Sequence, residues 1–173
     1  RFEPGAVLEA MERDRVTVFE GVPTMYVALL NHPGVEERDL SALRVAISGG
    51  APIPAEVLDE FERTFGLVIL EGYGLSETAS TTTFNASAED RRVYSVGKPI
   101  WGVELEVRDP LGRPLPAGRD HIGEIVVRGV NVMRGYHDNP AATAEAIVDG
   151  WLHTGDLGFV DEDGFVFIVD RKK

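Results

Sequence analysis

The chain has 173 residues, of which 43% are apolar and 27% charged, and it contains no cysteine. This composition is that of a folded globular domain, so it excludes disordered, collagen-like and disulfide-stabilised chains. Lysine and arginine number 17 against 29 aspartate and glutamate, a net charge of −12, which argues against nucleic-acid binding. No apolar run approaches the roughly 20 residues of a transmembrane helix. We therefore expect a cytoplasmic protein with no nucleic-acid partner and no transmembrane segment.

The first half of the chain has the pattern of alternating helices and strands. Apolar residues at helical spacing predict helices at Gly5–Arg15 and Pro54–Phe65, and the largely apolar segment Pro23–Leu30 predicts a buried helix. Short apolar runs predict two buried strands, at Leu43–Ser48 and Leu67–Leu70. A strand, a helix and a strand with short connections form the βαβ unit of a parallel sheet. Residues 1–93 are therefore predicted to be a partial α/β subdomain with a parallel sheet.

From about residue 94 the pattern changes to strands and turns. Apolar runs, some of them alternating with polar residues, predict strands at Val103–Arg108, Gly123–Arg128, Leu157–Val160 and Phe165–Val169. Asn139–Ile147 is predicted to be a short helix, with Asn139 as its N-cap and Pro140 in its first turn. The fold class is therefore α/β, in which a small β-rich, barrel-like subdomain over residues 94–173 follows the parallel-sheet subdomain.

Two glycine-containing segments follow the predicted strands of the first half. Gly49, Gly50 and Ala51 come directly after one strand, where a ligand can approach a backbone that lacks Cβ atoms. The segment Gly72–Thr78 follows the next strand and brings an aromatic ring, two hydroxyls and a carboxylate together. These groups could stack on a base and hold a phosphate and a divalent cation. A tight turn and a helix cap are the alternative interpretations of the two segments.

The third candidate segment is Gly150–Asp156, together with the basic residues at the end of the chain. Asp156 could accept hydrogen bonds from a ribose, and Arg171 could supply donors. A turn aspartate and a solvated basic edge explain the same residues without a ligand.

Taken together, these segments resemble the adenylate-forming (AMP-binding) superfamily and its acyl-CoA synthetase branch. The resemblance runs in family order over nearly the whole chain. The segments that carry it are VPTMYVALL (22–30), LRVAISGGAPIP (43–54), EGYGLSETAS (71–80), SVGKP (95–99), GEIVVRGVNVMRGY (123–136), GWLHTGDLG (150–158) and VDRKK (169–173).

The resemblance implies an acid–CoA ligase that uses ATP, CoA and Mg²⁺. A carboxylic acid, expected to be a fatty acid, reacts with ATP to give an acyl-adenylate and pyrophosphate. The thiol of CoA then displaces AMP. Peptide-synthetase adenylation domains, which usually carry GGE and YGPTE at the corresponding places, remain an alternative, as do a non-catalytic nucleotide-binding module and an interaction protein.

The resemblance also implies roles for individual residues near the adenine and the phosphates. Tyr73 corresponds to the aromatic residue that stacks on adenine, and Ser76 to the residue that touches the α-phosphate. Glu77 corresponds to the carboxylate that holds Mg²⁺, so Ser76 and Glu77 are the expected catalytic residues. The residues expected to line the nucleotide through their backbone are Gly49, Gly50, Ala51, Gly72 and Gly74.

The end of the chain is implied to bind the ribose and to begin a hinge. Asp156 and Arg171 correspond to the ribose-binding pair, and Lys173 to the hinge about which a C-terminal domain rotates. The family's phosphate-binding loop would precede Arg1, and its lysine-bearing C-terminal domain would follow Lys173. We therefore expect a fragment of a longer enzyme that is inactive by itself.

Overall fold

The computed structural model describes residues 1–172, which form two compact units. The first unit comprises residues 1–71 and 86–94, and the second comprises residues 72–85 and 95–173. The sequence-based division into residues 1–93 and 94–173 stays a prediction, because residues 72–85 group with the second unit and residues 86–94 with the first. The chain therefore passes between the units three times.

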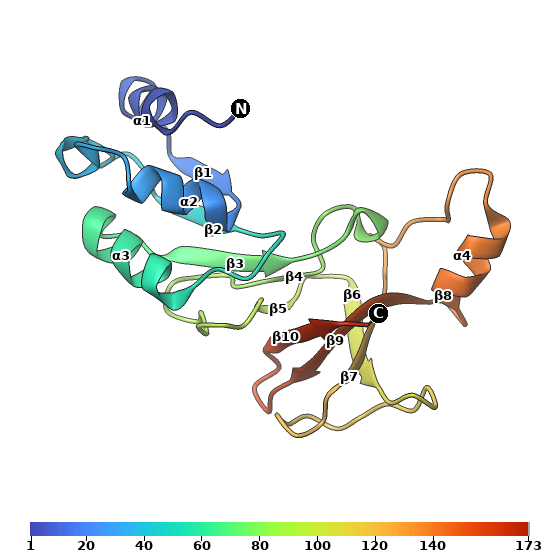
Figure 1. The fold of residues 1–173 in the computed structure, drawn as a ribbon. Coiled ribbons are helices and arrows are strands. Elements are labelled where there is room, and N and C mark those ends of the chain that lie inside the picture. The colour runs from blue at the N-terminus through green and yellow to red at the C-terminus, as the bar shows by residue number, and fades with distance from the viewer. Residues whose placement is uncertain (173) are drawn as a thin grey trace. The chain divides into compact units, whose positions relative to one another are not determined.

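The first unit contains a parallel sheet of three strands (Figure 1). Strand β1 (Val18–Gly21) pairs with β2 (Val45–Ser48), and β2 pairs with the first part of β3 (Ile69–Tyr73). Gly21, Ser48 and Glu71 lie opposite one another at the carboxyl ends of these strands. Ligands of open parallel sheets bind at this edge, so it is where a site is expected.

Three helices contribute about half of the buried residues in the core of the first unit. Helix α2 (Pro23–Leu30) packs against both α1 (Pro4–Arg13) and α3 (Ala55–Phe65), and a short 3₁₀ helix η1 (Val35–Glu37) follows α2 (Figure 1). The α3 helix ends at Gly66, whose φ of 65° is the left-handed conformation of a C-cap.

Tyr26 of α2 lies at the centre of this core. Its ring is fully buried and meets the rings of Phe19 and Phe61 edge to face at 5.4 and 5.3 Å. Its hydroxyl donates to the carbonyl oxygen of Ile47 at 2.6 Å. The buried hydroxyl is thus paired, as a polar group in an apolar core must be, and the bond ties the helix to strand β2.

The second unit is built on an antiparallel sheet in the order β10-β9-β7-β6 (Figure 1). Its strands are β6 (Val103–Arg108), β7 (Gly123–Gly129), β9 (Trp151–Val160) and β10 (Val166–Arg171). A two-residue strand β8 (Ile147–Val148) also pairs with β9. The core of the sheet is formed by Val107, Ile125, Val127 and Val166.

Short elements complete the second unit. Gly72 and Tyr73 at the end of β3 pair with β4 (Thr83–Phe84), which pairs with β5 (Lys98–Pro99). A 3₁₀ helix η2 (Ser76–Thr78) lies between β3 and β4. Helix α4 (Pro140–Ala146) begins with the predicted cap, because the Asn139 side chain accepts from the N–H of Ala142.

The α/β fold class predicted from the sequence, with a parallel sheet and a β-rich second part, is confirmed. The predicted helices are present, although Pro54 is the N-cap of α3 rather than its first helical residue. Strand β1 was missed, because it is only four residues long and mostly solvent-accessible. Among the described residues, no helix has both the length and the apolar character needed to cross a membrane.

Two predicted strands are longer than the sequence indicated. β3 extends to Tyr73, so Gly72 and Tyr73 lie in a strand and not in the loop after it. β9 begins at Trp151 instead of Leu157. The register of β9 against β7 shifts between Glu124 and Val126, which makes a bulge in β9 that contains Gly155 with a φ of 74°. Such a bulge interrupts the alternation by which a strand is recognised, so the motif did not look like a strand.

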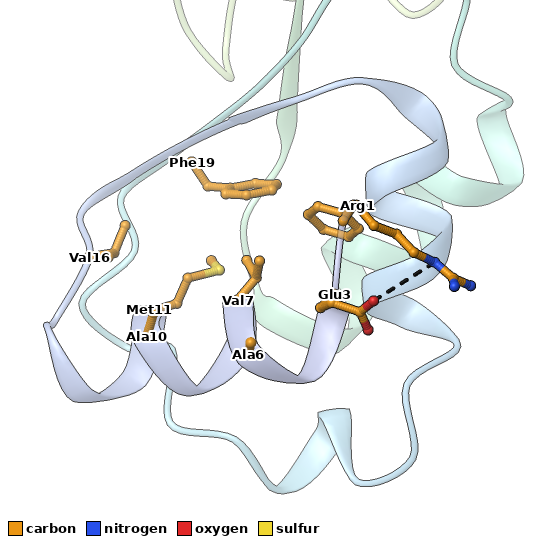
Figure 2. A pocket seen from close by; sticks show the side chains of 9 residues that line it. Arg1, Glu3, Ala6, Val7, Ala10, Met11, Val16 and Phe19 are labelled. Atoms are coloured by element: carbon orange, nitrogen blue, oxygen red, sulfur yellow. Dashed lines mark ion pairs between the residues drawn. The ribbon is translucent and has the colours of Figure 1, made fainter.

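An open apolar hollow of about 460 Å³ lies beside α1 and β1 (Figure 2). An ion pair between Arg1 and Glu3 lies at the hollow, with its nitrogen and oxygen 3.8 Å apart. The other lining residues are Phe2, Ala6, Val7, Ala10, Met11, Val16 and Phe19. None of the candidate site residues lines this hollow.

Glu71 carries the most perturbed carboxyl group of the first unit. Burial raises its pKa to about 7, although the charge of Arg91 and a backbone hydrogen bond at Tyr94 act to lower it. The ordinary value is 4.5. Between these two pH values the folded protein keeps a proton that the unfolded chain releases. Stability contributed by this group therefore falls as the pH rises through that window.

We expect Glu71→Gln to stabilise the protein at high pH only. The free energy of unfolding of the variant should match that of the wild type near pH 4, where Glu71 is protonated in both the folded and the unfolded protein. At pH 8 it should exceed the wild type by on the order of 1–2 kcal/mol, a figure reduced for partial exposure. Urea unfolding at both pH values measures this. Glu60→Gln, on the exposed face of α3, is the control, and an equal gain there would contradict the assignment.

Candidate nucleotide site

The loop that carries Ser76 and Glu77 is held in shape by Thr78, whose side chain is fully buried. The Thr78 hydroxyl accepts from the N–H of Leu75 at 2.9 Å and donates to the carbonyl oxygen of Leu75 at 3.0 Å. It also accepts from the hydroxyl of Thr82 at 2.9 Å. The helix-cap interpretation of this segment therefore holds for Thr78, and it leaves Ser76 and Glu77 free for another role.

Close backbone packing explains the glycine at position 74. A Cβ atom there would overlap the carbonyl oxygen of Ser80, so no larger residue fits without a change in the loop. Ala79 and Ser80 have φ values of 50° and 85°, which are sparsely populated for residues with a side chain. Such strain is held only where the surrounding contacts require it, and it concentrates at functional sites.

Ser76 and Glu77 are both accessible at this loop, and they differ in their contacts. Ser76 is exposed, and its hydroxyl has no hydrogen bond to the described residues. Glu77 is partly buried, and its Oε1 accepts from the hydroxyl of Tyr136 at 2.8 Å. This bond raises the pKa of Tyr136, because the neutral phenol is the form that donates. The partner of the Glu77 carboxylate is thus a neutral phenol.

Asp156 lies in β9, directly after the bulge, and is largely buried. Its Oδ2 accepts from the hydroxyl of Tyr73 at 2.6 Å, and its Oδ1 is 3.6 Å from Nε of Arg171 on the neighbouring strand. Burial and this bond to Asp156 raise the pKa of Tyr73. The structure therefore brings together Tyr73, Asp156 and Arg171, three of the residues expected from the sequence.

Glu124 is a further residue of this region that the sequence did not single out. Its carboxylate is 3.0 Å from Nδ1 of His153 and 3.4 Å from Nζ of Lys172, and it accepts from the N–H of Gly155 at 3.3 Å. Burial acts to raise the Glu124 pKa, but His153 and Lys172 outweigh it and the pKa is lowered. Glu124 thus binds Gly155, which precedes Asp156, and Lys172, which follows Arg171.

The remaining candidates are the glycine-containing turn after β2, Gly72 and Lys173. Gly49, Gly50 and Ala51 belong to the first unit, in the turn after β2, where Gly50 has a φ of 79°. The residue before them, Ser48, is buried, and its Oγ has no hydrogen-bond partner among the described residues. Gly72 packs under Phe84, whose ring leaves no space for a Cβ. Lys173, the expected hinge, lies outside the described residues.

The arrangement of the second unit is suited to binding a polyhydroxylated, anionic ligand. A buried carboxylate next to an arginine can accept from vicinal hydroxyls, and an acidic residue that binds ribose hydroxyls is a recurring feature of nucleotide sites. Among residues 1–172 there is no group of three or more His, Asp or Glu side chains placed to hold a metal by themselves. A cation at Glu77 would therefore need further ligands from the substrate. Mg²⁺ bound at phosphates is commonly held in this way, by one or two carboxylates together with phosphate oxygens.

Comparison with known proteins decides the family. The sequence profile of the AMP-binding enzyme family matches residues 1–137. This chain belongs to the AMP-binding enzyme family. The match covers most of the chain and includes the loop of Ser76 and Glu77, while Asp156 and Arg171 lie beyond it.

The curated relatives of this chain are much longer than the chain itself. It is 44% identical to a feruloyl-CoA synthase of Amycolatopsis over 99% of its own length and 35% of that protein. It is 40% identical to a long-chain-fatty-acid–CoA ligase of Bacillus subtilis, over 100% of the chain and 31% of the relative. The chain thus spans about a third of the curated relatives that it matches.

A solved structure agrees with the fold. The crystal structure of ATP-bound MatB from Rhodopseudomonas palustris superposes with a TM-score of 0.90 at 40% identity. The match covers 99% of this chain and 33% of that protein. This chain therefore shares its fold with part of a protein whose crystal structure contains ATP.

We expect Thr78→Val to destabilise the loop of Ser76 and Glu77. The change keeps the shape of the side chain but leaves the N–H of Leu75 and the buried hydroxyl of Thr82 without their acceptor. An unpaired buried polar group costs about 1–3 kcal/mol, so the free energy of unfolding should fall by that amount. Urea unfolding measures it, with Thr81→Val as the matched control, because the Thr81 hydroxyl makes no bond to the described residues. Equal losses in both variants would contradict this account of the loop.

Proposed function

We propose that the full-length protein is an AMP-forming acid–CoA ligase and that this chain supplies its ribose-binding and metal-binding residues. The observation that carries the proposal is the paired carboxylate of Asp156, held by Tyr73 and Arg171 within a chain of the AMP-binding family. The names of its relatives support the CoA ligase branch. We propose an apolar carboxylic acid as the substrate, a class that includes the fatty acid expected from the sequence.

The proposed nucleotide contacts follow from the chemistry of each side chain. Asp156 accepts hydrogen bonds from the ribose hydroxyls, and Arg171 donates to the same sugar. Tyr73 stacks on the adenine, while its hydroxyl keeps Asp156 oriented through the 2.6 Å bond. The backbone of Gly49, Gly50, Ala51, Gly72 and Gly74 is proposed to lie along the nucleotide.

Glu77 and Ser76 are proposed to act at the phosphates. The Glu77 carboxylate has one neutral partner and no ion pair among the described residues, so its charge is available to a cation. A bound Mg²⁺ would withdraw charge from the phosphate oxygens and so lower the barrier to attack. The exposed Ser76 hydroxyl donates to an oxygen of the α-phosphate. Both residues thus act on charge that develops in the transition state, where fixed groups are most effective.

The proposed reaction has two steps. A carboxylate oxygen of the acid attacks the α-phosphorus of ATP, and the bond from that phosphorus to pyrophosphate breaks. The sulfur of CoA then attacks the acyl carbon, its proton is released, and AMP leaves with the bond electrons. We place the hinge between these steps at Lys173, and we propose that this chain without the rest of the protein is inactive. The cytoplasmic location expected from the sequence belongs to the same proposal, because ATP and CoA are its substrates.

Glu77→Gln in the full-length protein should slow adenylate formation by roughly 10²- to 10³-fold, the loss typical of a missing preorganised charge-stabilising group. Glutamine keeps the shape and can still accept from Tyr136, but it removes the negative charge. Acid-dependent exchange of labelled pyrophosphate into ATP measures this step. The matched control is Glu145→Gln, on the exposed surface of α4, which should retain the wild-type rate. An unchanged rate in Glu77→Gln would assign Glu77 to the stability of its loop.

A further inference from the structure

The segment after β7 contacts the loop of Glu77 at three points. The N–H of Met133 donates to the carbonyl oxygen of Glu77 at 2.8 Å, and Nδ2 of Asn131 donates to the carbonyl oxygen of Thr81 at 2.8 Å. The hydroxyl of Tyr136 donates to Oε1 of Glu77 at 2.8 Å. Two of the bonds fix the backbone of the loop, and the third fixes the side chain of Glu77.

Helix α4 holds Tyr136 in place. The N–H of Tyr136 donates to Oγ1 of Thr143 at 2.9 Å, and that hydroxyl donates to the carbonyl oxygen of Asn139 at 2.9 Å. Gly135 lies so close to Thr143 that a Cβ atom there would be 2.6 Å from its methyl group. The backbone of Tyr136 is therefore anchored to the first turn of α4, so its ring extends toward Glu77 from a fixed position.

The bond from Tyr136 is the one hydrogen bond that the Glu77 carboxylate makes to a side chain among residues 1–172. No lysine or arginine of the described residues pairs with Glu77, so no protein charge neutralises it. A phenol on Oε1 restricts the rotation of the carboxylate, whereas Oε2 has no partner within the described chain. Partners that hold a metal ligand in this way are needed for full metal affinity in many sites.

We propose that Tyr136 is a positioning residue that holds the Glu77 carboxylate so that its second oxygen is available to the cation of the bound nucleotide. This inference rests on the proposed function of Glu77. Tyr136 acts through Glu77 and touches neither the nucleotide nor the acid. Its contribution is to the metal-dependent part of nucleotide binding and not to the contacts with base and ribose.

The test measures ATP affinity by calorimetry in the full-length protein, without acid, so that no reaction occurs. Each variant is titrated with ATP once in the presence of Mg²⁺ and once in the presence of EDTA. The dissociation constant in EDTA divided by the dissociation constant with Mg²⁺ gives the contribution of the metal. Tyr136→Phe should lower this ratio about tenfold, at the low end of the loss for such partners, and leave the affinity in EDTA unchanged. Tyr94→Phe, at an exposed tyrosine of the first unit, should change neither value.

Glu77→Gln separates the failure of this inference from the failure of the proposed function. If Glu77→Gln abolishes the effect of Mg²⁺ while Tyr136→Phe keeps the wild-type ratio, the role of Tyr136 is wrong and that of Glu77 stands. If Tyr136→Phe weakens ATP binding equally with Mg²⁺ and with EDTA, the tyrosine is structural and the inference is overturned. If Glu77→Gln itself keeps the wild-type ratio, the proposed metal role of Glu77 fails, and the inference fails with it.

Discussion

The hydrogen bond between Tyr73 and Asp156 is the contact on which the organisation of the site depends. It joins residues 83 positions apart at a distance of 2.6 Å, one at the end of β3 and the other after the bulge of β9. A carboxylate in a largely buried position is stable only when its oxygens are paired. Tyr73 and Arg171 supply those partners. Asp156 therefore links the end of β3, which carries Tyr73, to the last strand β10, which carries Arg171.

The β9 bulge gives Asp156 its direction. Gly155 has a positive φ, which residues with a side chain rarely adopt. The hydroxyl of Thr154 donates to the carbonyl oxygen of Ile125 at 2.7 Å and accepts from the N–H of Asp156. The carbonyl oxygen of Gly155 accepts from the N–H of Lys172 at 2.6 Å. The residues beside Asp156 are therefore bonded to β7 and to the chain after β10. This explains why a motif with few apolar residues folds as part of a strand.

Much of the fold could be predicted from the sequence, because α1 and α3 have clear apolar faces, α2 is a largely apolar segment, and α3 ends at a recognisable glycine cap. Strand β1 and the extent of β9 could not, since a short exposed strand and a strand with a bulge lack the alternation that marks a strand. Tyr73, Glu77, Asp156 and Arg171 could be named as candidate site residues through the family motifs. Tyr136 and Glu124 were not, although both lie within a quoted motif, because their importance comes from partners distant in sequence and only the folded chain reveals them.

The central claim is that Asp156 binds the ribose of the nucleotide. The most direct measurement is a crystal structure of the full-length protein with AMP. We expect both ribose hydroxyls to lie within hydrogen-bond distance of the Asp156 carboxylate, with the adenine stacked on Tyr73. A structure in which the ribose contacts other residues, and Asp156 bonds only to Tyr73 and Arg171, would contradict it.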